Sequence, residues 1–215
     1  MSLAKFAIPD AGIESSRVRL TLYEPLTHNN QVLAQFSAHP ELGRWLPAIY
    51  SPEVLQELFD DPNGILLAVT DKPTGRLAGV IGLGQTSFRD MSTEIGPVIC
   101  FPEFQRTYVT SHAVAVLLRH CLDLPSEAGG MGFRRVQWKA HSMNVASVKA
   151  AERMGFKMEG TLRWTHVLPP GREGQAAGRG RGEALGRDSC LLAICWDDWE
   201  SGGRELVQKV LDRTS

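Results

Sequence analysis

The segment 144–160 constrains the fold of this chain more than any other. Asn144 can cap a helix with its side-chain oxygen, and apolar residues then recur at every third position, at Val145, Val148, Ala151 and Met154. Gly155 can adopt the left-handed backbone that ends a helix, and an alternating pattern resumes at Phe156. Residues 134–143 alternate as well, so the sequence predicts a strand, a capped helix, a tight turn and a second strand in immediate succession.

Similar patterns predict the remaining elements. Alternating or continuous apolar runs indicate strands at 17–26, 65–70, 77–89, 93–101 and 188–196. Helical periodicity indicates helices at 29–38, 52–60, 110–122 and 204–211. The strands first follow one another and later alternate with helices, which predicts an α/β protein built on a mixed (α+β) sheet.

Composition excludes several classes of protein. The formal net charge of −1 leaves no basic footprint over the whole chain, so we expect no nucleic-acid partner. No apolar run approaches the ~20 residues of a membrane span, and no signal-peptide pattern is present, so we expect no membrane partner and a cytoplasmic location. The four cysteines lack C-x-x-C spacing and the six histidines lack ligand spacing, so we expect neither disulfides nor a bound metal.

Two segments together resemble a known family. They are Asn144-x-x-Ser147 with Met154-Gly155-Phe156, Glu159-Gly160 and Leu162-Arg163, and upstream the run FPEFQRTYVTSHAVAVLLRHCL. The chain resembles the GNAT acyltransferase superfamily from about Arg17 to Trp199, in the branch similar to the ribosomal-protein N-acetyltransferases. The resemblance implies a central, mostly antiparallel sheet of about seven strands flanked by four or five helices.

The resemblance also implies an activity. GNAT enzymes move an acyl group from acetyl-CoA or a related acyl-CoA to an amine without a covalent enzyme intermediate. We therefore expect an N-acyltransferase, most simply an N-acetyltransferase, whose acceptor is a primary amine of a small molecule, a peptide or a protein. Acetyl-CoA is then a co-substrate, no metal takes part, and the protein is a monomer or a homodimer.

The expected coenzyme contacts lie on three elements. A loop that leads into a helix suits the pyrophosphate, because free backbone N–H groups and the helix dipole favour an anion there. The family pattern Gln/Arg-x-x-Gly-x-Gly/Ala keeps only its first position here, since both small residues are replaced. The loop contacts are Gln105, Arg106, Thr107, Tyr108, Val109 and Thr110. The resemblance adds the backbone of Val98, Ile99 and Cys100 beside the pantetheine, and Asn144, Ser147 and Arg153 on the following helix.

Three residues are candidates for proton transfer, and the sequence does not choose among them. A primary amine is mostly protonated at neutral pH, so a base is useful. Relatives carry a glutamate at the position of Glu94 and an acid near His166, and they place a serine at Ser147 beside the thioester. Each of these residues can instead have a purely structural role. Glu94 and His166 can be surface residues of strands, and the Ser147 hydroxyl can form a hydrogen bond within the first helical turn. The tyrosine that many relatives use as an acid is replaced by Ala151.

The acceptor is expected to meet the linker HPELGRWLPAIY. Trp45 and Tyr50 in this linker can pack against a substrate, although an aromatic residue in a loop can equally plug the core. Nothing in the linker specifies a carboxylate, a sugar or a peptide.

Two other functions fit parts of the sequence. The glycine run 79–84 suggests a dinucleotide enzyme, but it lacks a third glycine and opens no helix, so it does not match that fingerprint. The altered coenzyme loop and the absent tyrosine fit a non-catalytic GNAT-like domain that binds an acyl-CoA or a protein partner as a sensor. Release of thiol from acetyl-CoA separates the sensor from the enzyme.

The domain boundaries follow from these patterns. We expect residues 1–16 to form a loose arm, 17–199 a single GNAT-like acyltransferase domain, and 200–215 a C-terminal helix. Within the domain, 171–187 is rich in Gly and Arg and poor in apolar residues, which predicts a flexible insertion. The alternative is a mobile basic flap that touches the coenzyme or an acidic acceptor.

Overall fold

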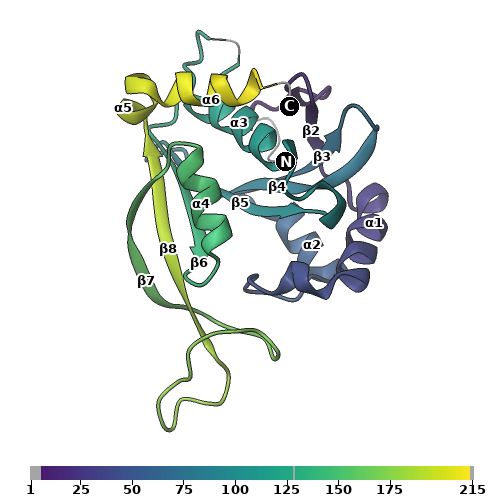
Figure 1. Ribbon diagram of the computed structural model, residues 1–215, viewed down its shortest axis with the longest axis vertical. Helices are drawn as coiled ribbons and strands as arrows, with labels where there is room; N and C mark the ends of the chain where they lie inside the picture. Colours follow the sequence, from purple (N-terminus) through teal and green to yellow (C-terminus); the bar gives the residue numbers. More distant parts are fainter. Residues whose placement is uncertain (1–5, 128, 214–215) are drawn as a thin grey trace.

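The computed structural model describes residues 6–127 and 129–213. Its centre is an eight-stranded sheet of order β1-β2-β3-β4-β5-β6-β8-β7, shown in Figure 1. The strands are β1 (Ile13–Glu14), β2 (Val18–Leu22), β3 (Ile65–Asp71), β4 (Arg76–Ser87), β5 (Ser92–Cys100), β6 (Arg135–His141), β7 (Lys157–Val167) and β8 (Gly186–Cys195). Neighbouring strands are antiparallel except β5 and β6, which are parallel. The expected mixed, mostly antiparallel sheet is confirmed.

Some of the helices begin at residues that cap them with a side chain. The helices are α1 (Pro25–Ala38), α2 (Pro52–Asp60), α3 (Val109–Leu122), α4 (Val145–Arg153), α5 (Trp196–Asp198) and α6 (Arg204–Leu211), with the short 3-10 turns η2 (Pro40–Gly43) and η3 (Pro102–Phe104) and the π turn η4 (Trp199–Gly203). Ser51 caps α2 by accepting the backbone N–H of Val54. Asn144 caps α4 through its Oδ1, 3.1 Å from the N–H nitrogen of Ser147.

Helices cover both faces of the sheet. The centres of β3 and β4 are buried without alternation, as expected for strands packed on both sides. On one face α3 packs against β5 and β6, and α4 packs against β6 and β8. On the other face α2 contacts β3, and the linker after α1 reaches β6, where the rings of Trp45 and His141 lie 5.0 Å apart.

The expected loose arm at 1–16 is wrong for the residues that the structure describes. Phe6 is fully buried, and its carbonyl oxygen lies 2.7 Å from Nε2 of His120. β1 pairs with β2, which adds the eighth strand to the sheet. An apolar anchor and a strand pairing therefore hold residues 6–16 to the domain, while residues 1–5 lie outside the described part. The predicted first strand is also too long, because the chain enters α1 at Pro25, a favoured first helical position.

The C-terminal helix packs onto the domain. The apolar face of α6 buries Val207 and Val210 next to α3. Trp199, just before α6, is 1% exposed, and its indole N–H donates to Oδ1 of Asp123 over 2.9 Å. The segment after residue 199 is therefore part of the same core, with residues 214–215 outside the described part.

The boundaries of the predicted insertion 171–187 need correction. At one end, Glu173 forms an ion pair with Arg44 over 2.7 Å and its carbonyl accepts from Nε2 of His141. Gln175 and Gly186 exchange two backbone hydrogen bonds on the edge of β8 that faces away from β7, since Gly186 pairs with Val167 on its other side. Long-range hydrogen bonds thus fix both ends, whereas residues 176–184 make only one recorded hydrogen bond, within their own turn.

Replacing residues 176–184 with an Asn-Gly dipeptide is expected to leave the melting temperature within a few degrees of the parent protein. The exposed loop contributes no buried apolar contact, and Asn-Gly suits a hairpin turn. Differential scanning calorimetry measures the change. Removal of the whole segment 171–187 serves as the comparison and is expected to destabilise the fold, because it also removes the start of β8 and the bonds of Glu173. A large fall in the melting temperature after replacement of residues 176–184 would show that this loop is itself structural.

Among the described residues, no helix has the length and apolar character needed to cross a membrane.

Candidate functional site

Strands β5 and β6 separate partway along their length. They pair in parallel only from Ser92 to Glu94 on β5, whereas β5 continues to Cys100 and β6 to His141. The separation follows Glu94 and coincides with Pro97, which has no N–H to continue a ladder. Beyond this point β5 keeps its pairing with β4 on one side only. Backbone groups of the stretch Val98–Cys100 on the β6 side are therefore left without a strand partner.

The loop before α3 uses most of its side chains to hold its own shape. Gln105 donates from Nε2 to the carbonyl of Cys100 over 3.1 Å, and Thr107 donates to the carbonyl of Phe104 over 2.6 Å. Tyr108 donates its hydroxyl proton to Asp71, and Arg17 lies 3.4 Å above its ring. The side chain of Tyr108 is thus directed away from the loop surface, so its expected coenzyme contact is limited to the backbone.

Arg106 differs from its neighbours in the loop. Its backbone has φ of +62°, a left-handed conformation that glycine favours. Its side chain is exposed and makes no recorded hydrogen bond or ion pair with the part of the chain that the structure describes. The loop therefore presents one uncommitted positive charge beside the start of α3. The N-cap residue Tyr108 provides no side-chain cap there, and Thr107 accepts only the N–H of Val109, over 3.3 Å. Free N–H groups and a cation at one place suit a phosphate group.

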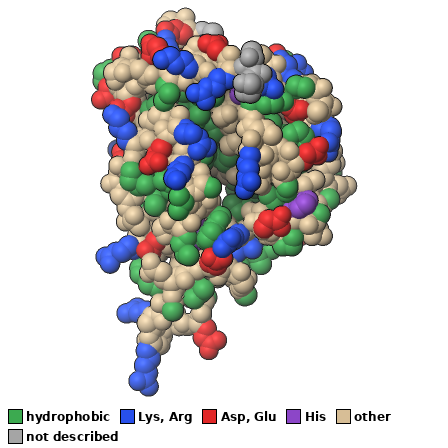
Figure 2. All heavy atoms as spheres, in the orientation of Figure 1, with side chains coloured by type: hydrophobic (Ala, Val, Ile, Leu, Met, Phe, Trp, Pro, Cys, Tyr) green, Lys and Arg blue, Asp and Glu red, His purple; other side chains and the backbone are tan. Residues whose placement is uncertain are grey.

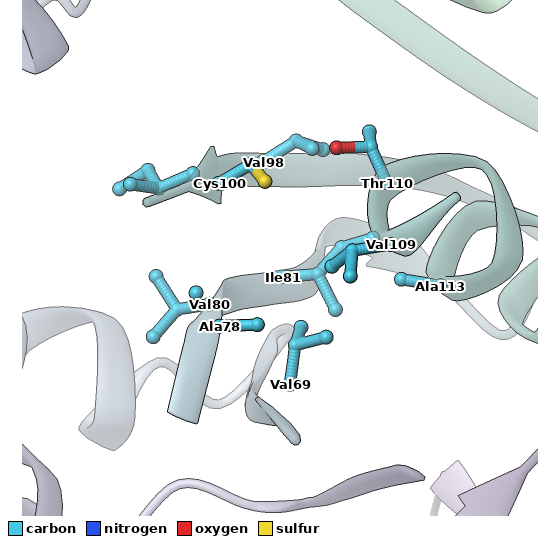
Figure 3. A pocket seen from close by; sticks show the side chains of 11 residues that line it. Val69, Ala78, Val80, Ile81, Val98, Cys100, Val109, Thr110 and Ala113 are labelled. Carbon is cyan, nitrogen blue, oxygen red and sulfur yellow. The ribbon is translucent and has the colours of Figure 1, made fainter. Parts of the chain in front are cut away.

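A small apolar cavity lies behind the open stretch of β5. Its volume is only about 10 Å³, and Figure 3 shows its walls formed by β3, β4, β5 and the start of α3. Val98, Ile99, Cys100, Val109 and Thr110 line it together with residues of β3 and β4. Burial raises the pKa of the Cys100 thiol, and the Thr110 hydroxyl acts in the opposite sense. The predicted coenzyme residues on β5 and α3 are thus adjacent in space.

Ser147 lies in the first turn of α4, and its hydroxyl has a specific partner. The indole N–H of Trp138 donates to Oγ of Ser147 over 3.0 Å. Trp138 is 4% exposed and faces α4, so it fixes the oxygen while leaving the Ser147 proton available. Arg153 lies at the other end of α4, about 12 Å along the helix from Val145, and its side chain is exposed.

Glu94 lies where β5 and β6 begin to separate, and its carboxylate is already paired. Nζ of Lys139 is 2.8 Å from its Oε2, and Nε2 of Gln137 is 3.2 Å from the same atom. Lys139 also donates to Gln85 over 2.8 Å. The ammonium group of Lys139 and the amide of Gln137 therefore occupy one of the two carboxylate oxygens that an incoming amine would have to reach. A free carboxylate base would therefore require Lys139 to move.

His166 shares this face of the sheet with Glu94. On β7 it is directly opposite Arg187 of β8. The pKa of His166 is below its ordinary value, mainly because its ring is partly desolvated and further because Arg187 and Lys139 repel a proton, while Glu94 acts in the opposite sense. His166 is therefore neutral at pH 7. A neutral imidazole can accept a proton.

The three catalytic candidates do not all lie together. Gln137 and Lys139 point to the Glu94 side, whereas Val136, Trp138 and Ala140 alternate to the α4 side. Glu94 and His166 are thus on one face of the sheet and Ser147 on the other. Only a group lying between the separated ends of β5 and β6 can reach both faces.

Of the two aromatic residues expected at the acceptor site, one faces the sheet and the other packs internally. Trp45 lies over His141, with the guanidinium of Arg44 4.6 Å from its ring. Tyr50 stacks on Phe36 at 4.8 Å, and its burial raises its pKa strongly. Tyr50 therefore packs against the core, and of the two residues only Trp45 remains a candidate for the acceptor contact.

One face of the molecule is hollowed. Figure 2 shows a furrow on the face that carries α4, with Lys and Arg side chains along both of its sides. Positive side chains along a furrow favour an anionic ligand such as a pyrophosphate. Among the described residues, Cys195, Asp197 and Asp198 form one group with metal-ligand spacing, but Asp198 is already paired with Lys157.

Sequence reasoning missed three residues of the site. Trp138, Lys139 and Arg187 each act on a predicted residue from a distant segment or from the neighbouring strand. Lys139 was detectable, since it falls on the polar side of an alternating strand. The partners of Trp138 and Arg187 depend on tertiary contacts, which no local pattern records.

Comparison with known proteins gives the following results. A family model described as an acetyltransferase (GNAT) domain matches residues 19–157. The crystal structure of a probable GNAT acetyltransferase from Chromobacterium violaceum has a TM-score of 0.74 at 26% identity, covering 89% of each chain. RimJ of Mycobacterium smegmatis in complex with CoA-disulfide has a TM-score of 0.68 at 16% identity, covering 93% of this chain and 90% of that one. An acetyltransferase of Salmonella typhimurium that modifies the N-terminal serine of ribosomal protein L7/L12 has a TM-score of 0.63 at 18% identity, covering 84% and 96%.

The curated proteins compared give no match. The last two structures share the fold alone at their low identity, whereas the family model extends over more than half of this chain. The matched range runs from β2 to the start of β7 and includes the separated strands β5 and β6, the loop before α3 and the capped helix α4. The chain belongs to the GNAT acetyltransferase family.

Proposed function

We propose that this protein is an N-acetyltransferase that moves an acetyl or related acyl group from acyl-CoA directly to a primary amine of a small molecule, a peptide or a protein. One observation carries the proposal. β5 leaves β6 after Glu94, and the open stretch Val98–Cys100 leads directly to Arg106 and the start of α3. A free strand edge followed by a positively charged helix terminus fits an extended ligand that ends in a pyrophosphate.

The anion-binding end depends on Arg106 and α3. Arg106 has no competing partner in the described chain, and the first N–H groups of a helix lack intrahelical acceptors. The side chains of Gln105, Thr107 and Tyr108 hold the shape of the loop and do not contact the pyrophosphate themselves. The RimJ structure, which contains CoA-disulfide, supports the choice of ligand for a shared fold.

The reacting end lies between the two sheet faces. A backbone N–H of the open β5 stretch can donate to the thioester oxygen as negative charge develops on it. His166, neutral at pH 7, removes the proton from the attacking amine. Ser147 donates a hydrogen bond to the departing thiolate sulfur while Trp138 holds its oxygen. Glu94, whose Oε2 is held by Lys139, borders the same space and accepts a hydrogen bond from the amine through its Oε1.

Arg106→Ala is expected to weaken acetyl-CoA binding about tenfold, because a charge-assisted hydrogen bond contributes about 1.5 kcal/mol or more. Isothermal titration calorimetry measures the effect. Arg106→Lys is expected to retain most of the affinity, and Arg213→Ala, another exposed arginine, is the matched control. Absence of binding to the parent protein at millimolar coenzyme would refute the proposed coenzyme.

A second function is a non-catalytic one, because Ala151 occupies the position where many relatives carry a tyrosine that acts as an acid. A non-catalytic domain that senses acyl-CoA would bind acetyl-CoA and release no thiol with any amine. Thiol release measured with a panel of primary amines therefore separates the two functions. Release that depends on both acetyl-CoA and an amine supports the enzyme.

A further inference from the structure

A buried arginine on the Glu94 face of the sheet has no acceptor in the described part of the chain. Arg187 is 6% exposed, and its Nε is sealed from solvent without a hydrogen-bond partner. No described carboxylate lies within 4.0 Å of its guanidinium. A buried cation without a partner is strongly unfavourable. The terminal Nη1 and Nη2 atoms are not sealed in this way and have no hydrogen-bond acceptor among the described residues, so an acceptor from outside the chain can reach them.

The groups around Arg187 do not supply that acceptor. The nearby carboxylate of Glu94 is held by Lys139 at 2.8 Å and by Gln137 at 3.2 Å. His141 accepts the N–H of Met143 at Nδ1, so its Nε2 carries the proton that it donates to Glu173. Asp188, next in the chain, accepts instead from the backbone N–H of Trp164 and from the side chain of Gln175.

Arg187 also lies beside the proposed base. Its position on β8 is directly opposite His166 on β7, and side chains at opposed positions of a strand pair lie on the same face with Cβ atoms about 5 Å apart. The cation and the base therefore face the same space, with Glu94 within electrostatic range of both. A ligand that carries an anion and an amine a few bonds apart can reach Arg187 and His166 together.

We propose that Arg187 binds a carboxylate of the acceptor, so that the substrates are amines carrying a carboxylate close to the reacting nitrogen. This inference rests on the proposed N-acetyltransferase function. The planar guanidinium donates two parallel hydrogen bonds to a carboxylate, a geometry that lysine cannot reproduce. The carboxylate can belong to a free amino acid or to an acidic residue near a peptide N-terminus.

Matched acceptors test the substrate class. Each free amino acid is compared with its amide and with its decarboxylated amine, and peptides beginning with Asp are compared with those beginning with Asn. In at least one of these two comparisons, we expect kcat/KM to be about 10- to 100-fold higher for the acceptor that carries the carboxylate. A higher kcat/KM for amino acids than for their amides and amines indicates a free amino acid as the acceptor. A higher kcat/KM for peptides that begin with Asp than for those that begin with Asn indicates an acidic peptide. Equal kcat/KM within every pair would overturn the inference and leave the transferase function intact.

Arg187→Met separates recognition from structure. The ratio of kcat/KM between the acid and its amide is expected to fall towards one, through a higher KM for the acid, while the KM for acetyl-CoA stays the same. Because the variant removes a buried unpaired cation, its melting temperature should equal or exceed that of the parent protein. Arg213→Met is the matched control. A clear loss of stability with an unchanged ratio would show a structural role and overturn the proposal.

Binding of an N-acetylated product is measured separately from turnover. N-acetylglycine and N-acetylglycinamide are titrated by calorimetry into the protein saturated with coenzyme A. We expect the acid to bind at least tenfold more tightly than the amide, and Arg187→Met to remove the difference. This difference without turnover of any amine would uphold the carboxylate site and refute the transferase. Turnover of an amine, with equal binding of acid and amide and equal kcat/KM, would uphold the transferase and refute the carboxylate site.

Discussion

His166→Gln is expected to lower kcat/KM for the acceptor about 100- to 10,000-fold, the usual effect of removing a general base. Glutamine keeps the size and polarity of the side chain but cannot take up a proton. His166 is exposed and makes one side-chain hydrogen bond, to Thr165, so stability should change by less than about 0.5 kcal/mol. Continuous detection of released thiol measures the activity.

The pH profile identifies the base. The pKa of His166 is lowered by partial burial and by Arg187 and Lys139, so the neutral form persists to lower pH than in a free histidine. The rising limb of kcat/KM against pH should therefore lie below the ordinary histidine value of about 6.5 and disappear in His166→Gln. Near-full turnover of His166→Gln, together with a large loss for Glu94→Gln, would assign the base to Glu94 instead.

Trp199→Ala is expected to reduce the free energy of unfolding by at least about 4 kcal/mol. Removing a buried aromatic side chain typically costs about 3–5 kcal/mol, and here Asp123 also loses the indole N–H at 2.9 Å. For a domain of this size the melting temperature should fall by about 8–16 °C. Urea unfolding followed by circular dichroism measures the free energy.

Trp196 provides the matched control, since it lies three residues earlier and is 52% exposed. Trp196→Ala should change stability by less than about 1 kcal/mol. Trp199→Phe retains most of the packing and loses only the hydrogen bond, so its effect should fall between the two. A small effect of Trp199→Ala would mean that the segment after residue 199 is not part of the folding core.

Local patterns were sufficient to locate most of the elements. The predicted helices at 52–60 and 204–211 have the observed bounds, and the predicted cap at Asn144 makes its hydrogen bond. These features depend on residues within one or two turns of one another. Capping residues and apolar periodicity record such contacts directly in the sequence.

Segments of unremarkable composition were predicted less well. Nothing local shows that Phe6 fills the core, that Tyr108 turns towards Asp71 and Arg17, or that Tyr50 stacks on Phe36. Each of these side chains is held by residues far away in the sequence. The ends of the segment 171–187 are fixed in the same way, although its composition alone predicts disorder.

By itself the sequence determined the mixed α/β class, the succession of strand, helix and strand that became β5, α3 and β6, the capped helix α4 and the resemblance to the GNAT family. The tertiary structure decided which candidates share a surface. It placed Lys139 against Glu94, Trp138 against Ser147, and left Arg187 buried beside His166 without an acceptor. Charge pairing and burial depend on strand register and on packing between distant segments, so only the folded chain specifies the polar groups that a substrate would meet.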